Sequence, residues 1–525
     1  MSGLSDPGRL ESPFHLGLLP AHHARFRADH VAVVFEGNRL TFAEFDRRIN
    51  RAANALTDAG IRKGDRFATV LPNSLELLEL YWAAAKTGAV IVPLPTLLRG
   101  PGLSSLLSDS GSTAVIANAA AAPVLDEIRG ELSGIAAGRW FLAGGEPRQG
   151  WASWDQAREE AEDSPPSGVE IRPDDPYNII YSSGTTGLPK GIVHTHRIRV
   201  GYCTLFASAW RMTPESVVLH AGSIVFNGAF LTLMPWMYLG TTYVLQKQFE
   251  PAQFVEAVRK ERATHVMMVP SQIVALLRSP AFTEGALSSL EMICSVGAPL
   301  HDEHKDELER RLPRRLYELY GLTEGFATIL DRDAPREKRG SVGVPPQFYE
   351  MRIVTSDGRE AAAGEVGEIV GRGPILMAGY YRRPEQTAEA VRDGWLYSGD
   401  LGYADEDGYL HLVDRKKDMI CSGGINVFPR DIEEVAVRHP AVREVAVFGV
   451  PDEKWGEAPL AAVVLRETGA ISTDALKAWI NERVPASYQR VCDVVFYEDF
   501  PRSAAGKTLK REMREIYWAG RAVKI

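Results

Sequence analysis

A loop rich in glycine and hydroxyl side chains follows a short apolar strand that ends near residue 181. Glycine lets backbone N–H groups approach an anion closely, hydroxyl groups donate hydrogen bonds, and a lysine supplies positive charge. The loop combines all three features, which indicates a cradle for a polyphosphate. It is not a Walker loop, because the GK[ST] ending is absent and no helix start follows at once. The residues that we expect to contact phosphate are Ser182, Ser183, Gly184, Thr185, Thr186, Gly187 and Lys190.

A second group of chemically useful side chains lies in the segment Tyr-Gly-Leu-Thr-Glu at residues 320–324. The ring of Tyr320 could stack on a base, the Thr323 hydroxyl could bond a phosphate oxygen, and Glu324 could bind a hard cation. Mg²⁺ carried by ATP takes one or two protein carboxylates and keeps several waters, so one glutamate is enough. Taken alone, these five residues would more often form a plain corner between a strand and a loop.

Two further groups of charged or glycine residues lie in the last quarter of the chain, one at 397–426 and one around Lys507. Asp400 could bond both hydroxyls of a ribose, as acidic residues do in dinucleotide-binding folds. The charged segment 414–418 and the sequence Ser-Gly-Gly at 422–424 follow it. Lys507 lies in a glycine-containing loop near the C-terminus, where a lone lysine is usually only a solvated charge.

The elements that must position these loops alternate between strand and helix over most of the chain. Residues 30–42 predict two strands around a Gly-Asn turn, and Thr41 starts a predicted helix that ends at Gly60. Strands that alternate with helices of 10–15 residues are typical of βαβ units and a mostly parallel sheet. After Ser341 the sequence changes to glycine-punctuated β segments, and after residue 418 to an α+β pattern.

The domain organisation follows from these changes of pattern. The chain of 525 residues suggests two to four domains at about 150 residues each. We place the main boundary at the short charged connector, which suits a hinge. We therefore predict an α/β fold with a large N-terminal domain at 1–414, a hinge at 415–418 and a small mobile α+β C-terminal domain at 419–525. The large domain should hold several subdomains, with mostly parallel sheets flanked by helices and a β-rich part.

The composition excludes several classes of protein. Hydrophobic residues make up 45% and charged residues 24%, which is typical of globular proteins. The net charge of −9 and the absence of long Lys/Arg runs argue against a nucleic-acid partner. The four cysteines lack the CxxC spacing of metal and redox sites, so we expect free thiols.

One long segment without Asp, Glu, Lys or Arg, residues 216–246, could be mistaken for a membrane span. Asn227, Gly228 and Pro235 interrupt it, and its ends are rich in valine like strands, so we predict buried core and no membrane span. The N-terminus carries early acidic residues and no apolar run of the kind found in signal peptides. We therefore expect a cytoplasmic protein, either a monomer or a homodimer.

Taken together and in this order, the four glycine-containing or acidic loops resemble those of the adenylate-forming superfamily. This superfamily includes acyl-CoA synthetases, adenylation domains and beetle luciferases, and the resemblance covers nearly the whole chain. Within it, the segments at 422–434 and 455–457 are most similar to bacterial fatty-acyl-CoA and halobenzoate–CoA ligases. The resemblance implies an AMP-forming carboxylate–CoA ligase that uses ATP, Mg²⁺ and coenzyme A.

The resemblance also implies roles in the first half-reaction, in which a carboxylate attacks the α-phosphorus of ATP. Residues 182–190 would hold the β- and γ-phosphates, Thr323 the α-phosphate and Glu324 the Mg²⁺. Asp400 and Arg415 would bind the ribose, and Lys507 would bridge the reacting oxygens. The implied adenine site consists of Gly297, Ala298, Pro299, Glu318, Tyr320 and Gly321.

In the second half-reaction the thiol of coenzyme A displaces AMP. Family members rotate the small domain about the residue two after the ribose-binding arginine, which is Lys417 here. The rotation withdraws Lys507 and brings up a pantetheine tunnel. The implied coenzyme A residues are Ser422, Gly423, Gly424, Tyr488 and Arg490, although Gln489 and Val491 replace the Lys and Pro that are common in that stretch.

The resemblance implies that three segments of the chain form the pocket for the carboxylic acid. Many family ligases have a histidine where this chain has Val225, and the aromatic side chains nearby favour an uncharged hydrophobic tail. Because residues 216–246 contain no basic side chain, we expect a dicarboxylate to be disfavoured. The predicted lining is Val225, Phe226, Asn227, Phe230, Val296, Gly297, Gly325, Phe326 and Ala327, although several of these aromatics could equally belong to the core.

Three alternative functions remain open at this point. The first is a stand-alone adenylating enzyme that loads an acid onto a separate carrier protein, since residues 508–525 are too few for a fused carrier domain. The second is luciferase-like oxidation of an adenylate, which no feature of the sequence demands. The third is a non-catalytic binding protein, against which the retained Lys507, Glu324 and Asp400 argue.

Overall fold

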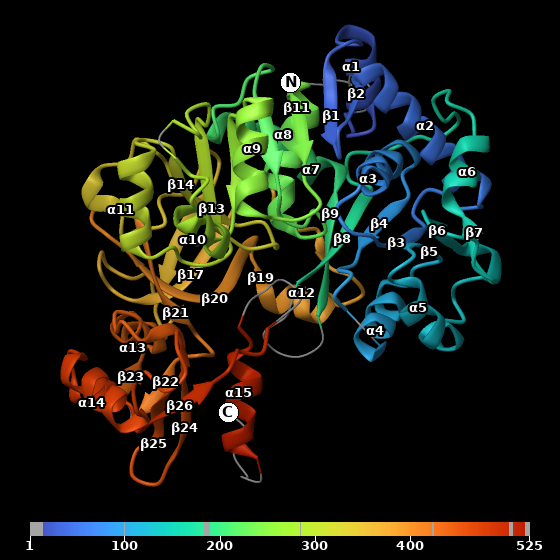
Figure 1. The fold of residues 1–525 in the computed structure, drawn as a ribbon. Helices are drawn as coiled ribbons and strands as arrows, with labels where there is room; N and C mark the ends of the chain where they lie inside the picture. The colour runs from blue at the N-terminus through green and yellow to red at the C-terminus, as the bar shows by residue number, and fades with distance from the viewer. Residues whose placement is uncertain are drawn as a thin grey trace, which may run out of the picture. The chain divides into compact units, whose positions relative to one another are not determined.

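The computed structural model describes residues 14–98, 100–182, 189–283, 285–422, 425–502 and 508–519 (Figure 1). Its contacts divide the chain into two compact units. The first unit holds Met1–Glu350 with Arg372–Leu396, and the second holds Met351–Gly371 with Tyr397–Ile525. The predicted domain boundary with a hinge at 415–418 stays a prediction.

The first unit contains two eight-stranded sheets. The first sheet has the order β15-β14-β13-β12-β10-β11-β1-β2. Its neighbours are parallel except for the edge pairs β1–β2 and β14–β15. The strands are β1 (Val31–Phe35), β2 (Asn38–Thr41), β10 (Val217–His220), β11 (Thr242–Leu245), β12 (His265–Met268), β13 (Met292–Val296), β14 (Leu316–Gly321) and β15 (Ala327–Leu330).

Helices connect the parallel strands of this sheet, as parallel pairing requires. Apolar residues of three of them, α9, α10 and α11, form one core with the sheet strands. In Figure 1 these three helices lie beside the green and yellow strands. The helices are α1 (Leu18–Phe26), α7 (His196–Ala209), α8 (Phe230–Leu239), α9 (Pro251–Glu261), α10 (Pro270–Arg278) and α11 (Asp302–Arg311), with the short turns η3 (Asn227–Ala229) and η4 (Arg336–Lys338).

The second sheet has the order β18-β9-β8-β4-β3-β5-β6-β7, with only β9 antiparallel to its neighbours. Its core is shared with α4 and α5. The strands are β3 (Arg66–Val70), β4 (Val90–Pro93), β5 (Ala114–Asn118), β6 (Trp140–Ala143), β7 (Ala152–Ser153), β8 (Pro176–Ser182), β9 (Lys190–Thr195) and β18 (Gly379–Tyr380). The helices are α2 (Phe42–Asp58), α3 (Leu75–Thr87), α4 (Gly100–Ser110), α5 (Ala122–Ile128), α6 (Trp154–Glu160) and α12 (Pro384–Ala390), with η1 (Arg129–Glu131) and η2 (Ala137–Arg139).

The second unit begins with a small sheet and continues into an α+β part. The small sheet is formed by β16 (Glu350–Val354), β17 (Gly367–Arg372), β20 (Trp395–Ala404) and β21 (Leu410–Arg415), while β19 (Val391–Arg392) pairs with the first residues of β20. The α+β part has the strand order β23-β22-β25-β24, with β26 parallel to β25. Its elements are β22 (Ile420–Ser422), β23 (Ile425–Val427), α13 (Pro429–Ala436), β24 (Val442–Asp452), β25 (Gly456–Leu465), α14 (Thr473–Arg483), η5 (Ser487–Gln489), β26 (Asp493–Tyr497) and α15 (Lys510–Trp518).

The segment 216–246 forms two strands and a helix, as predicted. β10 and β11 pair in parallel, and α8 connects them inside the core, where Phe230, Leu233 and Trp236 have no exposed surface. No helix in the described ranges is both long enough and apolar enough to cross a bilayer. The mixed α/β architecture confirms the predicted fold class.

Candidate active site

Lys190 and Glu324 both contact Tyr380. Nζ of Lys190 lies 4.7 Å from the centre of this ring. The Tyr380 hydroxyl donates a 2.8 Å hydrogen bond to Oε1 of Glu324. Burial, together with this carboxylate, raises the pKa of Tyr380, so the phenol keeps its proton and remains a donor. The structure thus brings two predicted catalytic residues together and adds Tyr380, which the sequence analysis missed.

The strand pairing explains why these residues meet. β18 pairs with β9, and Tyr380 stands opposite Ile192, two residues after Lys190. In the β8–β9 pair Ser182 stands opposite Lys190, so the two ends of the predicted phosphate loop are neighbours. The rest of that prediction, Ser183, Gly184, Thr185, Thr186 and Gly187, lies outside the described residues.

Thr323 and Glu324 lie in a tight turn directly after β14. Gly325 has a φ of +104°, and a Cβ there would lie 2.0 Å from the carbonyl oxygen of Ile375. Only glycine therefore lets the turn pack this closely against the neighbouring backbone. The amide of Met377 donates a 2.8 Å hydrogen bond to the Glu324 carbonyl. The turn is fixed by these contacts, while the side chains of Thr323 and Glu324 stay half-buried.

The carboxylate of Glu324 suits a metal ion that arrives with a nucleotide. No cluster of three or more His, Cys, Asp or Glu side chains in the described part of the chain forms a metal cage. One half-buried carboxylate, oriented by a tyrosine hydroxyl, is sufficient for Mg²⁺ that keeps waters and phosphate oxygens as its other ligands. Glu324 would hold such an ion.

The predicted adenine residues lie at the carboxyl ends of two neighbouring parallel strands, the edge where open α/β sheets bind ligands. Glu318 is buried, with 6% of its surface exposed, and forms a 2.6 Å ion pair with Lys305 of α11. Its carboxylate is therefore engaged by a lysine that the sequence analysis missed. The predicted residues are Gly297, Ala298 and Pro299, exposed after β13, and Glu318, Tyr320 and Gly321 on β14.

Eight of the nine predicted acid-pocket residues divide into two groups by burial, and the ninth, Gly297, is exposed. Phe226, Asn227 and Val296 are half-buried, and Nδ2 of Asn227 donates a 3.1 Å hydrogen bond to the Tyr202 hydroxyl. The exposed Val269, which the sequence analysis missed, lies 3.8 Å from where a Cβ on Gly297 would lie. The buried group, which packs into the core in this structure, consists of Val225, Phe230, Gly325, Phe326 and Ala327.

A buried arginine lies against the wall of this predicted pocket. The guanidinium carbon of Arg199, on α7, is 4.0 Å from the ring centre of Phe230 and 4.6 Å from that of Tyr202. The expectation that a dicarboxylate is disfavoured rested on the absence of basic side chains from one segment of the predicted pocket. It considered only residues 216–246, whereas the cation comes from a helix that precedes them in sequence and packs against α8. Arg199 itself is fully buried against the Phe230 ring, so the expectation about dicarboxylates stays a prediction.

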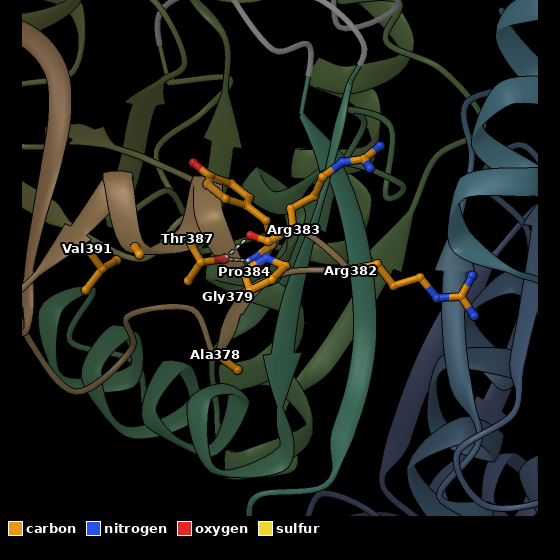
Figure 2. A pocket seen from close by; sticks show the side chains of 9 residues that line it. Ala378, Gly379, Arg382, Arg383, Pro384, Thr387 and Val391 are labelled. Carbon is orange, nitrogen blue, oxygen red and sulfur yellow. Dashed lines mark hydrogen bonds between the residues drawn. The ribbon is translucent and has the colours of Figure 1, made fainter.

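An open depression of about 490 Å³ lies beside Tyr380, between β18 and α12. Figure 2 shows Arg382 and Arg383 extending away from Thr387. The Thr387 hydroxyl accepts a hydrogen bond from the Tyr380 amide and donates one to the Arg383 carbonyl. Nη2 of Arg383 forms a 2.7 Å ion pair with Asp109. The depression borders the Lys190–Glu324 region rather than the predicted acid pocket.

In the second unit the predicted ribose residues face each other. Asp400 on β20 and Arg415 on β21 are register partners, with Nε of Arg415 3.5 Å from Oδ1 of Asp400. Lys417, the predicted hinge, follows in the turn between β21 and β22. Desolvation lowers the pKa of Lys417 to about 8. The structure thus pairs the two predicted ribose ligands directly before the predicted hinge.

The predicted coenzyme A residues lie on two neighbouring parts of the second unit. Ser422 is buried at the end of β22, opposite Gly456. Gly423, Gly424 and the predicted catalytic Lys507 lie outside the described residues.

The remaining coenzyme A residues, Tyr488 and Arg490, are exposed at and directly after η5. The residues between and after them point inward instead. Gln489 is buried and donates a 2.9 Å hydrogen bond to Asp431, and Val491 belongs to the core. Burial thus explains why this chain has an amide and an aliphatic side chain at 489 and 491, while Tyr488 and Arg490 are free to meet a ligand.

The models of two protein families match the chain. The model of the AMP-binding enzyme family matches residues 20–381, and that of the AMP-binding enzyme C-terminal domain matches residues 431–507. The chain is 38% identical over 513 residues to feruloyl-CoA synthase of an Amycolatopsis species, covering 96% of this chain and 99% of that protein. It is 36% identical over 491 residues to the long-chain-fatty-acid–CoA ligase FadD13 of Mycobacterium tuberculosis, covering 92% and 94%.

Among solved structures, ATP-bound MatB from Rhodopseudomonas palustris matches with a TM-score of 0.87 and 29% identity, covering 96% of this chain and 99% of that one. These matches confirm the resemblance to adenylate-forming enzymes and the predicted enzyme class, an AMP-forming acid–thiol ligase. They do not identify the acid. The chain belongs to the AMP-binding enzyme family.

Proposed function

We propose that this enzyme is an ATP-dependent CoA ligase for hydrophobic monocarboxylic acids. The observation that carries the proposal is that Lys190 and Glu324 both contact Tyr380, and Glu324 directly follows Thr323. A cation for phosphate oxygens and a carboxylate suited to Mg²⁺ thereby lie within one small region. Such a region fits transfer of an adenylyl group, because catalysis of that reaction rests on positioning and charge stabilisation.

In the first half-reaction a carboxylate oxygen of the acid attacks the α-phosphorus of ATP. An acyl–phosphate bond forms, the bond to the β-phosphate oxygen breaks, and pyrophosphate leaves. Residues 182–190 hold the β- and γ-phosphates, Thr323 binds the α-phosphate, and Lys507 stabilises the charge on the reacting oxygens. Mg²⁺, when bound by Glu324, supplies further neutralisation of phosphate charge. Asp400 and Arg415 bind the ribose.

In the second half-reaction the thiol of coenzyme A attacks the acyl carbonyl, and AMP leaves. Rotation about Lys417 withdraws Lys507 and brings in the region around Ser422. Tyr488 and Arg490 then meet the nucleotide of coenzyme A, for which their exposed positions are suitable.

The substrate is an acid with an uncharged tail, aromatic or medium-chain aliphatic. The half-buried Phe226 and Val296, with Asn227 as the polar group, offer an apolar wall. Each methylene that a small acid fails to bury loses about 0.8 kcal/mol, so acetate is disfavoured. The names of the two relatives, a feruloyl-CoA synthase and a long-chain-fatty-acid–CoA ligase, also describe acids with hydrophobic tails.

A panel of acids tests this proposal. Ferulate, benzoate, octanoate, palmitate, malonate and acetate are each incubated with ATP and coenzyme A, while AMP and thioester are quantified by chromatography. We expect kcat/KM for at least one of the first four to exceed that for acetate and malonate by several orders of magnitude. A preference for acetate or malonate would refute the pocket assignment. The variant Phe226→Ala should redistribute kcat/KM among tails and leave the KM for ATP nearly unchanged.

The alternative acceptor is the pantetheine thiol of a carrier protein. Replacing coenzyme A in the same assay by a pantetheine-loaded carrier protein distinguishes the two. Efficient acylation of the carrier together with slow acylation of coenzyme A would favour the carrier-loading enzyme.

A further inference from the structure

Three polar side chains from neighbouring elements of the first unit form a fully buried group. They are Asn178 on β8, His194 on β9 and Arg199 on α7, and each has 0% of its surface exposed. No carboxylate in the described part of the chain forms an ion pair with Arg199, and its Nη1 lacks a hydrogen-bond partner there. A buried cation without a counter-ion costs folding free energy. Such a group in a native structure therefore indicates a function that offsets the cost.

The hydrogen bonds of this group lead to the Thr323 turn. Nε of Arg199 donates to Oδ1 of Asn178 at 3.3 Å, and Nη2 of Arg199 lies 3.2 Å from Nδ1 of His194. On the other side of the ring, Nε2 of His194 lies 2.8 Å from the carbonyl oxygen of Thr323. His194 therefore bridges Arg199 and the backbone of the turn.

The chemistry of the partners determines the form of the His194 ring. A guanidinium has only N–H donors and no acceptor, so Nδ1 of His194 must accept its hydrogen bond. A carbonyl oxygen is only an acceptor, so Nε2 must carry the proton and donate it to Thr323. Burial and the charge of Arg199 both lower the pKa of His194 well below its usual value, which keeps the ring neutral. Arg199 thus selects the one tautomer that can hold the Thr323 carbonyl.

The same guanidinium also packs against the predicted acid pocket. Its carbon lies 4.0 Å from the ring centre of Phe230 and 4.6 Å from that of Tyr202, whose hydroxyl accepts the hydrogen bond from Asn227. Arg199 therefore contacts two buried rings beside the predicted acid pocket, and only the His194 ring separates it from the Thr323 carbonyl.

We propose that Arg199 and His194 are positioning residues that fix the Thr323–Glu324 turn relative to the acid pocket for adenylation. This inference rests on the proposed function. Neither side chain touches a reacting atom; Arg199 orients His194, and His194 holds the Thr323 carbonyl.

Kinetics of matched variants test the positioning role. His194→Leu keeps an apolar volume but removes the donor to Thr323, whereas His194→Gln retains a donor and an acceptor. We expect His194→Leu and Arg199→Met to lower kcat of acid-dependent ATP–pyrophosphate exchange by about 10–100-fold. His194→Gln should recover most of this loss, and the KM for ATP should change little. Thioester formation from supplied acyl-AMP should stay near the wild-type rate in all three variants.

A packing control and a spectroscopic readout separate positioning from folding. Cys203→Ala alters another fully buried side chain of α7 outside the hydrogen-bonded group and should leave the exchange kcat near wild type. In ¹⁵N-histidine NMR of the full chain, the signals lost in His194→Gln identify this ring. They should show a protonated Nε2 and an unprotonated Nδ1 from pH 6 to 8, and they should move in Arg199→Met.

The outcomes distinguish this inference from the proposed function. A wild-type ring protonated at Nδ1, or at both nitrogens, would overturn the inference whatever the activity. Equal loss in His194→Leu, His194→Gln and Cys203→Ala would overturn it as well, because that result means general sensitivity of the core. Absence of acid-dependent exchange in the wild type with every acid tested would instead refute the proposed function, while the NMR spectrum still decides the tautomer.

Discussion

The Tyr380 hydroxyl donates a 2.8 Å hydrogen bond to Oε1 of Glu324, although 56 residues separate the two in sequence. Lys190 lies over the same ring, with its Nζ 4.7 Å from the ring centre. Tyr380 therefore links the predicted phosphate lysine to the predicted Mg²⁺ ligand. Its position on β18, opposite β9, fixes the geometry through backbone pairing.

Replacing Tyr380 by phenylalanine should weaken adenylation specifically. The variant keeps the ring under Lys190 but removes the donor to Glu324, and a hydrogen bond to a charged group contributes about 1.5–3 kcal/mol. We expect kcat/KM for Mg·ATP in ATP–pyrophosphate exchange to fall by at least about tenfold. Thioester formation from supplied acyl-AMP should be unaffected.

The neighbouring tyrosine offers a control for this experiment. Tyr381→Phe removes a hydroxyl from a ring that contacts Arg382 and should behave like the wild type. Equal losses in the two variants would show that the Tyr380–Glu324 hydrogen bond has no special role.

Lys507→Ala should abolish the first half-reaction and spare the second. Its charge matters only while the α-phosphorus is attacked, and a contact made mainly in the transition state contributes about 3–4 kcal/mol, or roughly 10²–10³ in rate. Pyrophosphate release and thioester formation from supplied acyl-AMP are measured separately. Lys454→Ala, which removes an exposed lysine of the second unit, is the control. Pyrophosphate release at the wild-type rate would remove Lys507 from the mechanism.

Lys417→Pro should affect the half-reactions in the opposite way. Proline fixes φ near −65° and removes a backbone donor, so a connector that needs two backbone states loses one of them. Acyl-AMP should form and accumulate while thioester formation falls steeply. Lys417→Ala keeps the backbone freedom and should support both reactions. Unchanged thioester formation in Lys417→Pro would exclude residue 417 as the hinge.

Asp414 makes the stability of the second unit depend on pH. Burial raises the pKa of Asp414 to about 6, although the nearby Lys510 opposes this shift. The folded state therefore binds this proton more tightly than the unfolded state. The stability that the protonated form contributes is fully present below about pH 4 and is lost as the pH rises through 6.

The variant Asp414→Asn cannot ionise and should escape this loss. Its free energy of unfolding, relative to the wild type, should rise by about 2–3 kcal/mol between pH 4 and 7. A constant offset is expected in addition, because Asp414 accepts hydrogen bonds from the amides of Arg415 and Arg430 and an asparagine cannot replace both. Hydrogen exchange of peptides spanning 410–436 measures the effect, with Glu482→Gln as an exposed control. A pH-independent difference would contradict the assignment.

Local features of the fold were predictable because they depend on neighbouring residues. The Thr41 side chain accepts from the Glu44 amide in a capping box, as its N-cap prediction requires. The helix spans Phe42–Asp58 with Ala59 as its C-cap, and Gly60 ends it in the left-handed conformation, as predicted. The phosphate and ribose assignments stay predictions, although Asp400 and Arg415 stand opposite each other in one pair of strands.

Contacts between distant segments were not predictable in this way. The hydrogen bond between His194 and Thr323 joins residues 129 positions apart in sequence, and no local sequence pattern predicts it. Arg199 was missed because an arginine in a helix usually indicates a solvated face, whereas this one is fully buried. The pocket wall was judged from residues 216–246 alone, so a cation from an earlier helix escaped notice. Contacts between side chains of separate elements can be identified only once the fold is known.

The most direct measurement follows the oxygen atoms of the acid. The best acid of the panel is labelled with ¹⁸O in its carboxylate and converted with ATP and coenzyme A, and the products are analysed by mass spectrometry. If the carboxylate attacks the α-phosphorus, one ¹⁸O must appear in AMP, because the acyl–oxygen bond breaks when the thiol attacks. We predict one labelled oxygen in the AMP released per thioester formed. Label in inorganic phosphate or pyrophosphate, with none in AMP, would contradict adenylation at this site.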